Sequence, residues 1–275
     1  MLVLRPGALG DTLLAVPALR ALRRQFGQLR LAANFGAARL LASLGEVEEG
    51  LAFDDPSLAW LFAATPASAL TTSLGDPPSP DKIVAWMQTP QTGTALSHAL
   101  LVAPSRPVGE THCAQYLLET LALLGVDTSL VDDRPLNVTP IPSDEVLIHP
   151  GSGSTRKNWP AMRFAETIRK LDRPVRLIVG EADAPAASAI ETCLDKKLPR
   201  LTTPPLEELA ARLAGCHAYL GNDSGVSHLA GLCGSRTVVL FGPTSPAVWH
   251  PLGPQVHVMP FEADAEHVVA AVRGD

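Results

Sequence analysis

Short apolar runs that alternate with stretches of helical spacing constrain this 275-residue chain more than any other feature. The first run, residues 1–4, is followed by a glycine-containing turn and then by a helical pattern that extends to about Arg24. This order of strand, turn and helix favours parallel sheets with helices packed on their faces. Further strands are predicted at 29–33, 51–53, 82–86, 100–102, 145–149, 175–179, 218–220 and 237–241.

A proline-containing stretch without clear periodicity, residues 132–144, follows a predicted helix at 111–124. We interpret it as a linker between two domains. The chain is therefore predicted to be an α/β protein with two Rossmann-like halves, 1–135 and 145–275, that face a cleft. Its C-terminal helix can pack back on the first half.

Composition limits the kinds of partner and location. Hydrophobic residues make up 46% of the chain and charged residues 18%, which indicates a folded protein with a substantial core. The formal net charge of −6 gives no global field that favours nucleic acid. No apolar run reaches the length of a membrane-spanning helix, and the N-terminus does not resemble a secretory signal. The four cysteines are widely spaced and are interpreted as buried or free thiols.

The segment 221–230, GNDSGVSHLA, has the composition of a turn that delivers small polar residues to the start of a helix. Either Ser224 or Asp223 can cap that helix. Backbone N–H groups and the positive end of the helix dipole attract anions at such a position, and Gly225 allows the backbone to approach a diphosphate closely. An ordinary capped turn explains the same residues without a ligand.

A second loop of small residues, 150–158, separates a predicted strand from a helix that begins near Pro160. Its hydroxyl and cationic side chains are Ser152, Ser154, Thr155, Arg156 and Lys157. They indicate an anion-binding loop, although a solvated loop with two surface cations is the alternative. The loop has neither the Walker spacing nor a complete dinucleotide fingerprint. Two anion-prone turns in one half of the chain are what a nucleoside diphosphate would use.

Three acidic residues lie at or near the ends of predicted strands. Asp11 is either a helix cap or a base that takes a proton from a hydroxyl. Glu181 and Asp183 either hydrogen-bond ribose hydroxyls or are solvated acids of a loop.

The histidines show no paired spacing that suggests a metal site. His228 lies four residues after Ser224 and faces either phosphates or the core. His149, at the end of a predicted strand, is interpreted as structural.

Four groups of segments together resemble glycosyltransferase family 9, the ADP-heptose:lipopolysaccharide heptosyltransferases. They are LRPGALGDT at 4–12 with PALRAL at 17–22, IHPGS at 148–152 with KNWP at 157–160 and RFA at 163–165, GNDSG at 221–225 with HLA at 228–230, and LFGPT at 240–244. The resemblance spans nearly the whole chain. It implies a GT-B fold with the donor held mainly by the second half, the acceptor by the first, and inverting transfer without a metal.

Carried over by position, the resemblance makes Asp11 the general base and Lys157 a partner of the donor phosphates. The donor diphosphate site then comprises Asp223, Ser224, Gly225 and His228. The loop hydroxyls of Ser152, Ser154 and Thr155, together with Glu181 after a predicted strand, are further candidates for contact with the donor. Gly10 and Arg5 fall on the acceptor side. Two departures from the family pattern are a short first half and the residues RPGA at 5–8, which replace a serine-rich turn.

The resemblance implies a glycosyltransferase that moves a sugar, heptose from ADP-heptose, onto a lipopolysaccharide core or another glycan or lipid-linked acceptor, with no cofactor. A nucleotide-sugar-binding protein of the same fold with lost or altered transfer is one alternative. Another GT-B-like enzyme, such as a nucleotide-sugar epimerase or a transferase with a different base, is a second. We expect a cytoplasmic protein with at most peripheral contact at the inner membrane.

Overall fold

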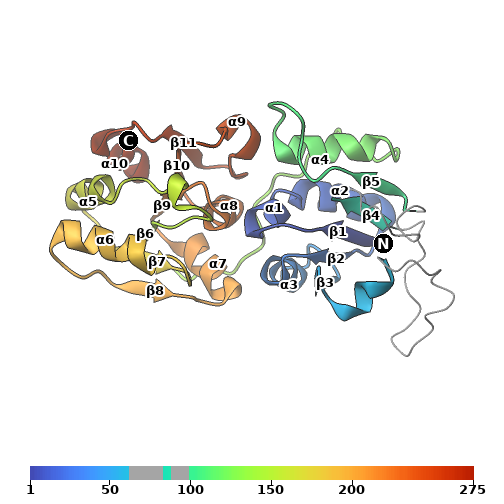
Figure 1. Cartoon of the computed structure of the whole chain (residues 1–275), viewed down its shortest axis with the longest axis horizontal. Helices are drawn as coiled ribbons and strands as arrows, with labels where there is room; N and C mark the ends of the chain where they lie inside the picture. The colour runs from blue at the N-terminus through green and yellow to red at the C-terminus, as the bar shows by residue number, and fades with distance from the viewer. Residues whose placement is uncertain (62–82, 88–98) are drawn as a thin grey trace. The chain divides into compact units, whose positions relative to one another are not determined.

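The computed structural model describes residues 1–61, 83–87 and 99–275. It divides the chain into two compact units, Met1–Asp132 and Asp133–Asp275 (Figure 1). The boundary lies in the stretch 123–145, which contains no helix or strand. Each unit is built around its own parallel sheet.

The N-terminal unit has a sheet in the order β3-β2-β1-β4-β5, with every pairing parallel. Its strands are β1 (Leu2–Arg5), β2 (Arg30–Ala33), β3 (Glu49–Ala52), β4 (Ile83–Trp86) and β5 (Leu101–Ala103). Its helices are α1 (Leu9–Leu13), α2 (Val16–Phe26), α3 (Phe35–Ser43) and α4 (Cys113–Ala122), with a 3₁₀ turn at Pro56–Leu61. The strand order reverses beside the central β1, and open α/β sheets bind ligands at the carboxyl end of such a switch point.

The C-terminal unit has a sheet in the order β11-β10-β9-β6-β7-β8, again parallel throughout. Its strands are β6 (Val146–His149), β7 (Val175–Val179), β8 (Arg200–Thr202), β9 (Ala218–Asn222), β10 (Thr237–Phe241) and β11 (Val256–Pro260). Its helices are α5 (Ala161–Lys170), α6 (Ala184–Leu194), α7 (Leu206–Gly215), α8 (Gly225–Leu232), α9 (Pro246–Trp249) and α10 (Ala265–Arg273), with a 3₁₀ turn at Thr155–Lys157. Here the switch point lies between β6 and β9.

The central strands are buried along their whole length because helices cover the sheet. Val146 and Ile148 of β6 share a core with Phe164 of α5. Val268 and Val272 of the C-terminal helix α10 join the same core. Part of the apolar face of this helix is thus used within its own unit, and its packing on the first half stays a prediction.

Two differences from the sequence-based elements have clear physical reasons. The single helix predicted up to Arg24 is broken into α1 and α2. Pro17 lies in the first turn of α2, where its missing N–H costs no hydrogen bond, whereas a continuous helix would need that donor. The edge strands β8 and β11 were not predicted, because both are partly exposed and neither is a continuous apolar run.

The remaining predicted strands agree with the structure to within two residues at each end, except that Lys82 lies outside the described residues. All four cysteines are free, with Cys113 and Cys233 buried. Within residues 1–61, 83–87 and 99–275, no helix has the length and apolarity needed to cross a membrane.

Glu191 of α6 anchors the edge strand β8. Its side chain is 2% exposed and accepts hydrogen bonds from Arg200 Nε at 3.0 Å, Arg200 Nη2 at 2.7 Å and Lys197 Nζ at 2.7 Å. The hydrogen bonds from Arg200 are the main reason that the pKa of Glu191 falls from its ordinary 4.5 to about 2. The ionised carboxylate is thus favoured by the folded state.

Replacing Glu191 with glutamine is expected to lower the free energy of unfolding at pH 7 by on the order of 2 kcal/mol. A folded-state pKa below the unfolded one contributes stability that is complete above the unfolded value and is lost as pH falls through the folded value. The wild-type protein should therefore lose stability between about pH 4.5 and pH 2 more steeply than the variant. Urea unfolding across that range measures both slopes, and parallel slopes would contradict the assignment.

Candidate functional site

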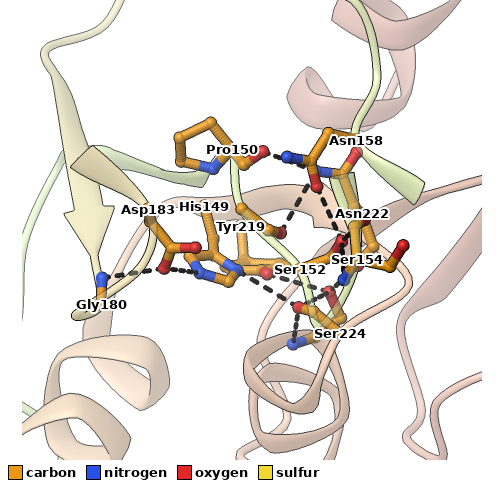
Figure 2. A network of polar contacts seen from close by, with 12 residues as sticks. His149, Pro150, Ser152, Ser154, Asn158, Gly180, Asp183, Tyr219, Asn222 and Ser224 are labelled. Carbon is orange, nitrogen blue, oxygen red and sulfur yellow. Dashed lines mark hydrogen bonds and ion pairs between the residues drawn. The ribbon is translucent and has the colours of Figure 1, made fainter. Parts of the chain in front are cut away.

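The loop after β6 and the turn after β9 meet at the switch point of the C-terminal unit. His149, the last residue of β6, is in register with Gly221 of β9. The Asn222 side chain joins the two segments, because its Nδ2 donates to the Pro150 carbonyl at 2.9 Å (Figure 2). Its Oδ1 accepts from the Trp159 N–H at 2.9 Å. The two anion-prone turns predicted from the sequence therefore lie side by side.

Ser224 is the N-cap of α8, and Gly225 is the first residue of that helix. The Ser224 hydroxyl accepts a hydrogen bond from the Ser227 N–H. Capping by the side chain satisfies one of the orphan N–H groups of the first turn and leaves the earlier ones available to an anion. Of the two predicted caps, Ser224 is the one used.

Asp223, just before this cap, is held by two hydrogen-bond donors. Lys157 Nζ lies 2.8 Å from Asp223 Oδ2, and the Thr244 hydroxyl lies 2.7 Å from the same oxygen. The carboxylate is 7% exposed and the lysine 30% exposed, so the cation remains within reach of solvent and ligand. The structure thus brings Lys157 to the start of α8, 66 residues away in sequence.

The other predicted donor-site residues vary in exposure. Ser152 Oγ lies 2.6 Å from the Ser154 carbonyl oxygen and 2.7 Å from Asn158 Oδ1, so its hydroxyl is engaged inside the loop. Ser154 and Thr155 are exposed on the same loop, and Glu181 is exposed after β7. His228, in contrast, is buried in α8. Their contacts with a donor stay predictions.

The structure joins His149, which the sequence analysis interpreted as structural, to Asp183, for which it left a ribose contact and a solvated loop acid open. His149 Nε2 lies 2.9 Å from Asp183 Oδ2, and His149 Nδ1 lies 3.2 Å from Ser224 Oγ (Figure 2). The Gly180 N–H donates to Asp183 Oδ2 at 2.9 Å. Hydrogen bonding to His149 is the largest cause that lowers the pKa of the Asp183 carboxyl. The adjacency of strands β6 and β7 creates this contact, and no local sequence pattern signals it.

In the N-terminal unit, Asp11 lies in α1 just beyond the carboxyl end of β1. Its Oδ2 accepts the Ala8 N–H at 2.9 Å, as a helix-capping carboxylate does. Its Oδ1 lies 3.6 Å from Arg5 Nη2, and the side chain is 19% exposed. Gly7 has a φ of +140°, and a Cβ there would lie 2.8 Å from Asp11 Oδ2. The glycine of the RPGA turn therefore makes room for the carboxylate.

Arg5, which the sequence assigned to the acceptor side, is a buried neighbour of Asp11, and its place on the acceptor side stays a prediction. Its side chain is fully buried, and Nη2 also donates to Cys113 Sγ at 3.7 Å. Burial lowers the pKa of the guanidinium and raises that of the Cys113 thiol. Gly10, also buried, contributes its carbonyl to the Leu14 N–H.

A cavity of about 590 Å³ lies at the carboxyl ends of β10 and β11. Its lining includes Phe241, Phe261, Thr244 and Arg156. Because Thr244 also holds Asp223, the cavity adjoins the Lys157 and Asp223 pair. Within the part of the chain that the structure describes, no three His, Cys, Asp or Glu side chains gather as metal ligands.

Two Rossmann-type units in one chain form the GT-B architecture, and the model for "Glycosyltransferase family 9 (heptosyltransferase)" matches residues 128–270. The match covers more than half of the chain, which therefore belongs to glycosyltransferase family 9. Lipooligosaccharide heptosyltransferase 2 of Haemophilus influenzae is 27% identical over 150 residues, which cover 51% of this chain and 41% of that protein.

Solved structures confirm the predicted GT-B fold. A family 9 glycosyltransferase from Veillonella parvula has a TM-score of 0.78 at 18% identity, over 99% of this chain and 95% of that one. E. coli heptosyltransferase WaaC with ADP has a TM-score of 0.69 at 17% identity, over 97% of both chains.

Proposed function

We propose that this protein is an inverting, metal-independent glycosyltransferase that transfers heptose from ADP-heptose to a lipopolysaccharide core or another glycan acceptor. Family membership supports the reaction class, and the relative solved with ADP supports the nucleotide. The single observation that carries the donor half of the proposal is the convergence of Lys157, Asp223 and the N-terminus of α8.

A diphosphate at this position would meet two sources of positive potential. The first is the N-terminus of α8, whose dipole and N–H groups favour negative charge. The second is the Lys157 ammonium, which is paired with Asp223 and is partly exposed. When the bond between the anomeric carbon and the diphosphate breaks, the electron pair leaves with the nucleotide. The lysine and the helix then stabilise the developing charge, the task that a metal ion performs in other enzymes.

The acceptor hydroxyl has to lose its proton as its oxygen bonds to the anomeric carbon. Asp11 is the proposed base, because an ionised carboxylate can receive that proton. Its Oδ1 is the oxygen not used by the Ala8 N–H, and it lies 3.6 Å from Arg5 Nη2. Backside attack with this single proton transfer inverts the anomeric configuration.

The hydrogen bond that Asp11 Oδ2 accepts also favours a second candidate function, that of a nucleotide-sugar-binding protein without efficient transfer. An aspartate that accepts the N–H of Ala8 at a helix start has a sufficient structural role without catalysis. Binding alone does not separate the two candidates, whereas turnover does.

Calorimetric titration with ADP, ADP-heptose, UDP and GDP in EDTA is the first experiment. We expect ADP and ADP-heptose to bind at least about tenfold more tightly than the other two nucleotides, a difference of about 1.4 kcal/mol. Repeating the ADP titration with Mg²⁺ instead of EDTA should leave the Kd unchanged. A preference for UDP or GDP would contradict the donor assignment, and binding only with Mg²⁺ would contradict metal independence.

A further inference from the structure

A line of polar contacts connects the loop after β7 to the N-terminus of α8. It runs from Asp183 Oδ2 to His149 Nε2 at 2.9 Å and from His149 Nδ1 to Ser224 Oγ at 3.2 Å (Figure 2). The three residues come from separate segments of the C-terminal unit, and both His149 and Ser224 are buried. No other residue intervenes between the carboxylate and the helix cap.

The backbone around Asp183 is shaped to admit its carboxylate. A Cβ at Gly151 would lie 1.8 Å from Asp183 Oδ1, and a Cβ at Gly180 would lie 2.7 Å from Oδ2. Any larger residue at Gly151 would displace the carboxylate from His149. Two separate loops thus leave room for one side chain, which indicates that the contact is a specific feature of the site.

The hydrogen bonds define the state of the imidazole. An ionised carboxylate only accepts, and hydrogen bonding to His149 lowers the pKa of Asp183. In a neutral ring, Nε2 therefore carries the proton and Nδ1 is the acceptor. The Ser224 hydroxyl then donates to Nδ1, and its oxygen lone pairs remain directed at the Ser227 N–H.

A second line of hydrogen bonds holds the other side of the cap. The buried Tyr219 hydroxyl lies 2.9 Å from Ser227 Oγ. The Ser227 hydroxyl in turn donates its proton to the Asn222 carbonyl oxygen. Because the Ser227 proton is used there, Ser227 can only accept from Ser224, whose Oγ lies 3.3 Å from Ser227 Oγ. His149 Nδ1, at 3.2 Å, is the other acceptor within reach of the Ser224 proton, and an imidazole nitrogen is a stronger base than a hydroxyl oxygen that already accepts from Tyr219.

We propose that Asp183 and His149 are positioning residues for the donor diphosphate. Asp183 selects the tautomer of His149 that accepts the Ser224 hydroxyl, which keeps Ser224 as the cap of α8 and aims the first N–H groups of the helix at the phosphates. This inference rests on the proposed function, since the anion is the diphosphate of the nucleotide sugar. Neither residue touches the reacting atoms.

The tautomer is measured without any ligand. Long-range ¹H–¹⁵N NMR spectra of histidine-labelled protein at pH 8, with the His149 signals assigned by their loss in His149→Gln, should show the proton on Nε2. In Asp183→Asn, whose amide can donate as well as accept, that preference should be lost. A proton on Nδ1 or a doubly protonated ring in the wild-type protein would overturn the proposal.

The role in binding is measured by a double-mutant cycle on ADP affinity. Asp183→Asn and Ser224→Ala should each raise the Kd for ADP by about five- to tenfold. Because Asp183 acts through Ser224, the double variant should bind no more weakly than Ser224→Ala alone. Glu166→Gln, which removes an exposed carboxylate from α5, is the matched control and should bind as the wild type does.

The outcomes separate this inference from the proposed function. Wild-type protein that does not bind ADP would overturn both. Wild-type binding with additive effects in the cycle, or with an unchanged Kd in Asp183→Asn, would overturn only the positioning role. Circular dichroism and melting temperatures identify variants that fail to fold. If Asp183→Asn is one of them, His149→Gln replaces it in the cycle, with the same expected non-additivity.

Discussion

Replacing Asp11 with asparagine is expected to slow glycosyl transfer by about two to four orders of magnitude while leaving ADP affinity unchanged. The amide matches the carboxylate in size, and its oxygen can still accept the Ala8 N–H at the start of α1. What the variant lacks is a group that can take the acceptor proton. Single-turnover rates with ADP-heptose and an acceptor, together with ADP titration, measure the two quantities separately.

Asp55→Asn is the matched control for this prediction. Asp55 also belongs to the N-terminal unit and accepts a backbone N–H, that of Ser57, at 2.9 Å. Its replacement removes the charge of a turn-capping carboxylate without affecting the proposed base, so turnover should equal that of the wild type. If Asp11→Asn also turned over at the wild-type rate, Asp11 would be a helix cap only and the base would have to be sought elsewhere.

The strands that could be predicted are those whose consecutive residues are all buried and therefore apolar. Strands β6 and β10 are buried along their whole length, so their apolar runs are visible without knowledge of their neighbours. β8 contains Arg200, whose guanidinium is paired with Glu191, and β11 contains the exposed His257. Such edge strands are defined by pairing with an adjacent strand, which the local sequence does not encode.

The residues of the site likewise divide into those that local sequence indicates and those that depend on neighbouring strands. Ser224, Gly225 and Lys157 could be proposed from local patterns, because caps, glycines and cations have local chemical signatures. The contact of His149 with Asp183 could not, because it depends on β6 lying beside β7. Likewise, the sequence placed Arg5 on the acceptor side and gave no sign that its side chain is buried. Its burial depends on the packing of Cys113, 108 residues away.

The second large effect on donor binding and transfer is expected from replacing Lys157. Lys157→Met should raise the Kd for ADP at least about tenfold and slow transfer at least about a hundredfold. The loss of rate exceeds the loss of affinity because negative charge on the departing diphosphate increases in the transition state. Lys196→Met, which removes an exposed lysine from the same unit, should change neither quantity. Equal titrations of Lys157→Met and wild-type protein would exclude this lysine from the donor site.

Lys157→Met alone combines two effects, because it also leaves the 7% exposed Asp223 carboxylate without its cation. We expect that unpaired charge to lower the free energy of unfolding by about 1–2 kcal/mol and to repel the diphosphate. Asp223→Asn in the same chain removes the charge, and its amide can still accept the Thr244 hydroxyl. The double variant should therefore recover stability and part of the ADP affinity. Its transfer rate should stay low, because the Lys157 cation that stabilises the leaving group would still be missing. Recovery of the rate would mean that Lys157 serves only to neutralise Asp223.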